Sequence, residues 1–89
     1  MDLARDLEAL TRKYLGRRVP LDALHKWLVS HVQAVADCPE PSVQHLADRI
    51  WILICEFDYG DRSESSVRAE VRVALDEFAR TPIGLPRPH

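Results

Sequence analysis

The fold is decided by residues 50–64, which read Ile-Trp-Ile-Leu-Ile-Cys-Glu-Phe-Asp-Tyr-Gly-Asp-Arg-Ser-Glu. The first six of these residues form the longest unbroken apolar run in the chain, and the remainder carries four carboxylates. A helix that is apolar on nearly every side is usually the most buried element of its fold. The apolar run therefore predicts the central helix of a small helical protein, and the acidic half predicts the turn that leaves it.

Length and composition predict one globular domain. The chain has 89 residues, of which 46% are hydrophobic and 29% charged. These fractions exclude a disordered chain, which has too few apolar residues to form a core. We expect a domain at residues 1–82 and an extended C-terminal tail at residues 83–89, where prolines prevent further helix.

The charge is unevenly distributed along the chain. Residues 31–60 carry one base, Arg49, against five acids, whereas residues 1–30 carry more bases than acids. A nucleic-acid-binding protein usually shows a basic stripe, and none is visible here. The acidic middle favours a basic protein partner and argues against nucleic acid as a ligand.

Apolar residues recur three or four positions apart in four segments, so each segment predicts an amphipathic helix. Val32 belongs to the second of these stripes and Phe57 to the third. The predicted helices are residues 2–15, 20–37, 42–57 and 64–80. We expect N-caps at Asp2, Ser42 and either Ser63 or Ser65, Pro20 at a first helical position, and Gly16 as a left-handed residue.

The short connections predict an all-α fold, a single antiparallel up-down-up-down four-helix bundle. Matching the stripes across the loops places Leu7, Leu28, Ile50 and Val71 in one layer, and Leu3, Val32, Leu46 and Leu75 in the next. Trp27 and Trp51 fall at the same height. Cys38 and Cys55 are predicted at opposite ends, roughly 20 Å apart, so both are expected to be free thiols.

No motif predicts catalysis, a metal site or a cofactor. The four histidines lack the spacing of metal ligands, and no C-x-x-C pair occurs. The serines lie outside any nucleophile elbow, and the three glycines form no phosphate-binding loop. We therefore expect no catalytic residue, no metal and no cofactor, and a protein that is not an enzyme.

The acidic turn is the candidate binding surface, and it has two interpretations. In the first, its acids are a solvated loop and helix start, partly paired with Arg17 and Arg18. In the second, an aromatic residue among acids at the end of a rigid bundle forms a protein interface. The candidate partner-binding residues are Glu56, Asp58, Tyr59, Asp61 and Glu64.

The stretch Cys55-Glu-Phe-Asp-Tyr-Gly-Asp-Arg62, followed by Val67-Arg-Ala-Glu-Val-Arg-Val-Ala-Leu-Asp-Glu-Phe78, resembles the colicin D immunity family and its colicin-like bacteriocin immunity relatives. The resemblance implies a four-helix protein that blocks a tRNA-cleaving toxin domain, with acidic side chains in place of RNA phosphates. Glu56 and Asp61 match acids of that family. Asp58 is shifted by one position, and Tyr59 stands where the family has an acid. The link between the last two helices is also shorter here.

The sequence thus leads to two functional hypotheses. The first is a cytoplasmic immunity protein, monomeric, that neutralises a basic nuclease toxin domain without catalysis of its own. The second is a helical regulatory or assembly module that forms a homodimer through Trp27 and Trp51. We expect no membrane association, because no apolar run approaches the ~20 residues that span a bilayer and Met1 is not followed by a signal peptide.

Overall fold

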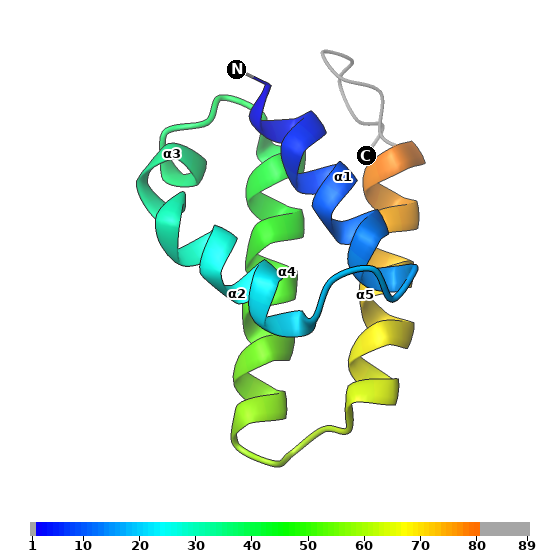
Figure 1. The fold of residues 1–89 in the computed structure, drawn as a ribbon. Helices are drawn as coiled ribbons and strands as arrows, with labels where there is room; N and C mark the ends of the chain where they lie inside the picture. Colours follow the sequence, from blue (N-terminus) through cyan, green and yellow to red (C-terminus); the bar gives the residue numbers. More distant parts are fainter. Residues whose placement is uncertain (1, 81–89) are drawn as a thin grey trace, which may run out of the picture.

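The computed structural model describes residues 2–80, and every regular element within them is a helix (Figure 1). The helices are α1 (Leu3–Leu15), α2 (Leu21–Ser30), α3 (Val32–Ala36), α4 (Pro41–Asp58) and α5 (Glu64–Arg80). The all-α prediction is confirmed, and α5 has the predicted bounds. The up-down-up-down topology of a regular four-helix bundle stays a prediction.

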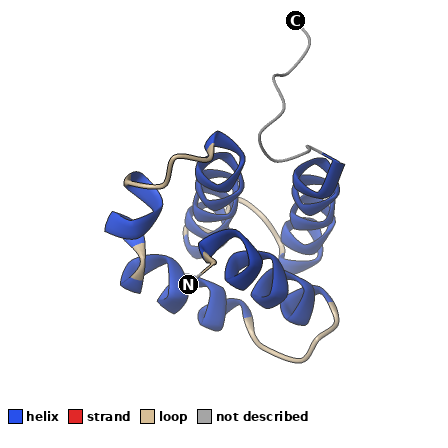
Figure 2. Cartoon of the chain, turned by 90° about the horizontal axis from the view of Figure 1, so that it is seen from above, coloured by secondary structure: helices blue, strands red, loops and turns tan. Residues whose placement is uncertain are grey.

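Helices α4 and α5 form an antiparallel hairpin, and α1 and α2 lie across one face of it (Figures 1 and 2). An ion pair between Arg49 and Glu70, 3.2 Å apart, joins the two long helices. The lower turns of the hairpin project beyond α1 and α2 (Figure 1). The connection between α4 and α5 is therefore the tip of a projecting hairpin.

The core lies where the four longer helices meet. Leu7, Ile50 and Val71 are fully buried, and Leu28 is nearly so, which is the burial expected of the predicted middle layer. Tyr14 is also completely buried, although it carries a hydroxyl group. Burying a large apolar side chain stabilises the fold by about 1.5–3 kcal/mol, so these residues account for much of its stability.

The predicted second helix, residues 20–37, is wrong in one respect, because it is divided at His31. The backbone of His31 is not helical, with φ −115° and ψ 15°. Its ring stacks on Trp27, with centroids 4.1 Å apart, and its Nδ1 lies 2.8 Å from the Trp27 carbonyl oxygen. Such side-chain bonds to the backbone compete with helix continuation, and the adjacent β-branched Val32 favours a helix only weakly.

The break changes the predicted packing of helix two. Val32 is 68% exposed and does not belong to a core layer with Leu3 and Leu46, contrary to the prediction. The ring of each tryptophan contacts a histidine. Trp51 contacts the ring of His25 edge-on, 5.5 Å between centroids, and Trp27 stacks on His31.

The sequence suggested that α4 is apolar and buried on nearly every side, but the structure differs. Trp51 is 42% exposed, Ile52 is 54% exposed, and Phe57, predicted to be a core residue, is 37% exposed. The neighbouring helices cover only one side of α4, and its last turns extend past α1 and α2 (Figure 1). An apolar face of α4 is therefore accessible.

Two predicted N-caps are confirmed. The Asp2 carboxylate accepts the Arg5 amide at 3.2 Å, and the Ser63 hydroxyl accepts the Ser66 amide at 3.2 Å. The prediction of Ser42 as an N-cap is wrong. Helix α4 begins at Pro41, with Glu40 as the N-cap, because a proline is well suited to the first helical position.

The connection between α1 and α2 also differs from expectation. Gly16 has φ −81°, and the left-handed residue is Arg17, with φ 62°. Pro20 precedes α2 as its N-cap and is not its first residue. The left-handed conformation at Arg17 lets the Arg18 amide bond the Lys13 carbonyl at 2.8 Å, which closes the end of α1.

Both cysteines are free, as predicted, with Cys38 in the loop after α3 and Cys55 in α4. The domain boundary at residue 82 and the predicted tail at residues 83–89 lie outside the described residues. Within residues 2–80, no helix combines the length and the hydropathy needed to cross a membrane.

Candidate partner-binding site

The tip of the α4–α5 hairpin is held by a compact hydrogen-bonded turn. The Gly60 amide donates to the Phe57 carbonyl at 3.0 Å, and the Asp61 amide donates to the Glu56 carbonyl at 2.9 Å. This pair of bonds is the Schellman arrangement, which needs a left-handed residue after the helix. Gly60 supplies it, with φ 79°. The turn therefore fixes the backbone of Asp61 relative to the end of α4.

Glu56 is one of the five predicted site residues, and it is engaged within the molecule. Its Oε1 lies 2.9 Å from Nε of Arg62, across the turn. Nη1 of the same arginine donates to the Ser66 hydroxyl at 2.8 Å. Arg62 thus links the end of α4 to the first turn of α5, and it neutralises Glu56.

Glu64 is the second predicted residue that is already paired. Its Oε2 accepts Nη2 of Arg68 at 3.1 Å and the Tyr14 hydroxyl at 3.3 Å. The Arg68 guanidinium lies over the Tyr14 ring, 4.7 Å from its centroid, and donates to the Tyr14 carbonyl at 3.1 Å. These contacts join α5 to α1.

The environment of Tyr14 stabilises its protonated form. Burial, and after it the negative charge of Glu64, raise the pKa of the Tyr14 hydroxyl to about 12, against the opposing effect of Arg68. Both causes disfavour a phenolate, the first by desolvation and the second by repulsion. Glu64 therefore has a structural role at the base of the tip.

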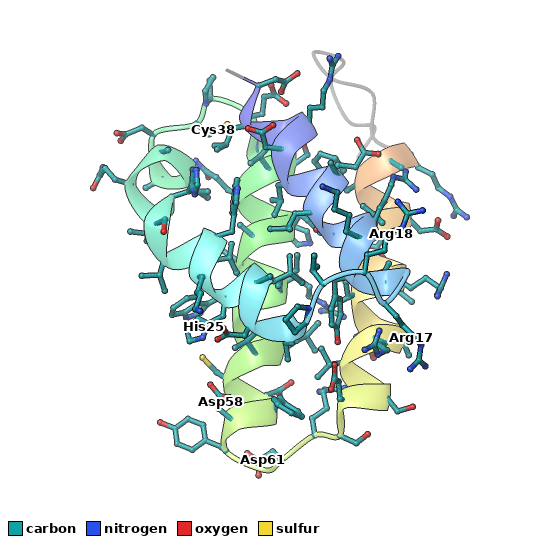
Figure 3. All side chains as sticks on the ribbon, viewed as in Figure 1. Arg17, Arg18, His25, Cys38, Asp58 and Asp61 are labelled. Carbon is teal, nitrogen blue, oxygen red and sulfur yellow. The ribbon has the colours of Figure 1, made fainter. Side chains whose placement is uncertain are left out.

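Within residues 2–80, no ion pair joins Arg17 or Arg18 to the acidic turn, a pairing that one of the two interpretations of the turn included. Both arginines lie beside α5, well above the turn that carries Asp61 (Figure 3). The α1–α2 connection ends short of the hairpin tip (Figure 1), although the charge of Arg17 acts on the Tyr14 hydroxyl and opposes the rise in its pKa that burial causes. Internal pairing does occur, through Arg62 and Arg68.

Asp58, Tyr59 and Asp61 are the predicted site residues that stay available to a partner; Figure 3 shows Asp58 and Asp61 at the end of the hairpin. Tyr59 is 83% exposed. Asp58 and Asp61 are exposed, and neither makes an ion pair or side-chain hydrogen bond with another described residue. The tip therefore presents two free carboxylates beside a phenol ring, a combination suited to basic side chains and to stacking.

A second accessible surface lies on α4, outside the residues predicted from the sequence. An open groove of about 480 Å³ separates the α2–α3 segment from α4. It is lined by Leu28, Val32, Val35, Ala36, Gln44, Ala47, Asp48 and Trp51. One signal was available in the sequence: Asp48 and Asp58 lie on the same side of the helix as Trp51, and unpaired acids are unusual on a face that is fully covered.

Among residues 2–80, no group of three or more histidine, cysteine or acidic side chains is arranged to hold a metal ion. No protein-family model matches the chain, and comparisons with curated proteins and with solved structures find no match. The geometry of the described residues is therefore the basis for the functional proposal.

Proposed function

We propose that this chain is a bacteriocin-type immunity protein, which acts in the cytoplasm and inhibits a basic nuclease toxin domain by binding it, without catalysis of its own. The observation that carries the proposal is the projecting hairpin tip, where Asp58 and Asp61 are exposed and have no ion-pair partner among residues 2–80, with the exposed Tyr59 between them in the sequence. The proposal includes the up-down-up-down topology, with α2 and α3 together as an interrupted second helix.

The tip has the properties of a competitor for a phosphate-binding site. A nuclease that cuts tRNA needs cationic side chains around its substrate. Two carboxylates held by a rigid turn can occupy that cationic site, and their field accelerates association. The narrow hairpin end suits insertion into a cleft, because α1 and α2 stop short of it (Figure 1).

The five candidate residues divide into two roles under this proposal. Asp58, Tyr59 and Asp61 contact the toxin. Glu56 and Glu64 hold Arg62 and Arg68, and they keep the turn and α5 in place. The charge offered to the partner is therefore smaller than the four acids of the turn suggest, which favours a small number of well-placed contacts.

The test begins with co-expression of this chain with the product of the neighbouring gene, followed by a pull-down and a tRNA-cleavage assay. Asp61→Lys places a positive charge against the cationic cleft. Loss of one partner of a desolvated charge pair costs on the order of 2–5 kcal/mol, so we expect binding at least ~30-fold weaker and loss of inhibition. Thermal melting should hardly change, because exposed acids contribute little to stability.

Asp6→Lys is the matched control. Asp6 is also an exposed acid without an ion pair among the described residues, and it lies on α1 near the opposite end of the molecule. This variant should bind and inhibit like the parent chain. Equal losses in the two variants would indicate a general charge effect, and full inhibition by Asp61→Lys would remove the tip from the interface.

A second candidate function is a helical regulatory or assembly module that acts through homodimerisation. The exposed apolar side chains of Val32, Trp51 and Ile52 favour it, since a contact between copies would bury them. Size-exclusion chromatography with light scattering separates the two candidates. A mass that rises with concentration supports the assembly module, and a constant monomer mass supports the immunity protein.

A further inference from the structure

One side of α4 carries a regular stripe that runs from the groove to the hairpin tip. Gln44, Asp48, Trp51, Cys55 and Asp58 follow one another at intervals of four and three residues. Side chains at this spacing lie on one side of a helix, as the seam of a coiled coil does. The upper part of the stripe lines the groove beside α2 and α3, and the lower part is on the projecting turns (Figure 1).

The charge on this stripe is unbalanced. Asp48 and Asp58 are exposed and make no ion pair with another described residue. They are separated by ten residues, or about 15 Å along the helix. By contrast, Glu56 and Glu70 of the same hairpin are each paired with an arginine. The stripe therefore offers Trp51, with Ile52 beside it, between two uncompensated negative charges.

A second copy of the chain would place like charges together if its stripe were aligned with this one. If two α4 helices packed antiparallel with Trp51 against Cys55 of the other copy, each Asp48 would face an Asp58. If they packed parallel, each aspartate would face itself. Like charges placed together at an interface oppose association. The occupant that the charges favour is an element carrying the opposite sign.

We propose that the α4 stripe and its groove bind a basic amphipathic helix of a partner protein. Apolar side chains of that helix pack on Trp51 and Ile52 and enter the groove of about 480 Å³. Two lysine or arginine residues about three helical turns apart meet Asp48 and Asp58. This inference rests on the proposed function, because Asp58 also belongs to the tip. The toxin domain would then supply the basic helix.

The probe for this inference is a synthetic 18-residue helical peptide without tryptophan. It carries leucines at intervals of three and four on one face and two lysines ten positions apart beside them. Binding is followed by the intrinsic tryptophan fluorescence of the chain, to which Trp51 on the stripe and Trp27 both contribute. We expect saturable binding by the parent chain. The dissociation constants of Ile52→Asp and Asp48→Lys should be at least tenfold larger. Val73→Asp is the matched control, since Val73 is an exposed apolar residue on α5, and it should bind like the parent.

Two further peptides test the charge and the pattern. A peptide with glutamates in place of the lysines, and one with the same composition in scrambled order, should bind at least tenfold more weakly. Equal binding of all three peptides, or equal losses for Ile52→Asp and Val73→Asp, would overturn the inference. A parent chain that is a dimer, and that Ile52→Asp converts to a monomer, would also overturn it. If the peptide does not bind but the chain inhibits a nuclease, only this inference fails. If the peptide binds and no nuclease is inhibited, only the proposed function fails.

Discussion

The contact between Tyr14 and Glu64 predicts a measurable pH dependence of folding. Tyr14 is buried, and its hydroxyl lies 3.3 Å from a carboxylate oxygen of Glu64. The pKa of this hydroxyl is raised from 10.0 to about 12 in the folded chain. The folded state therefore holds the proton more tightly than the unfolded state. The stability that results is fully present below pH 10 and is lost as the pH rises toward 12.

The size of the effect follows from the shift. At pH 11 a folded pKa of about 12 and an unfolded pKa of about 10 lower the free energy of unfolding by about 1.4 kcal/mol. Glu64 is 41% exposed, so solvent screens part of its repulsion, and we expect a loss of about 1 kcal/mol. At pH 8, Tyr14→Phe removes one long hydrogen bond and costs about 1 kcal/mol, while Glu64 keeps its pair with Arg68.

Urea unfolding of the parent chain and of Tyr14→Phe at pH 8 and pH 11 measures both quantities. The variant should be less stable by about 1 kcal/mol at pH 8 and nearly equal to the parent at pH 11. Tyr59→Phe is the control, because that phenol is exposed, and its difference from the parent should stay below about 0.5 kcal/mol at both pH values. A difference between parent and Tyr14→Phe that is the same at both pH values would refute the reasoning.

Three substitutions test the fold itself. Ile50→Ala should lower the free energy of unfolding by about 2–5 kcal/mol, because Ile50 is fully buried, and an unchanged urea midpoint would place it outside the core. Val32→Ala should change it by less than about 0.5 kcal/mol, and a loss above about 2 kcal/mol would mean that residues 20–37 form the continuous helix expected from the sequence. Gly60→Ala should cost about 1–2 kcal/mol although the site is open, because φ is 79°, and an unchanged thermal melt would contradict the left-handed turn.

The candidate site shows which of its features could be predicted from the sequence alone. The acids and Tyr59 were found from their density in the chain, but their availability depends on arginines nearby. The pairing of Glu64 with Arg68 could have been recognised, because a glutamate four residues before an arginine is a common helical ion pair. The pairing of Glu56 with Arg62 crosses a turn, so its geometry depends on the left-handed conformation of Gly60. For this reason the sequence did not separate the paired acids from Asp58 and Asp61.

The sequence by itself determined the helical character and most of the core, because both follow from local periodicity. Leu7, Ile50 and Val71 repeat with the helical period, and their burial needs only that the stripes face one another. The tertiary structure alone decided where helix two is interrupted and which apolar side of α4 is open. Those outcomes depend on a stack between His31 and Trp27 and on the length by which the α4–α5 hairpin projects past its neighbours. Neither the ring stack nor the length of the projection can be read from the spacing of apolar residues within one helix.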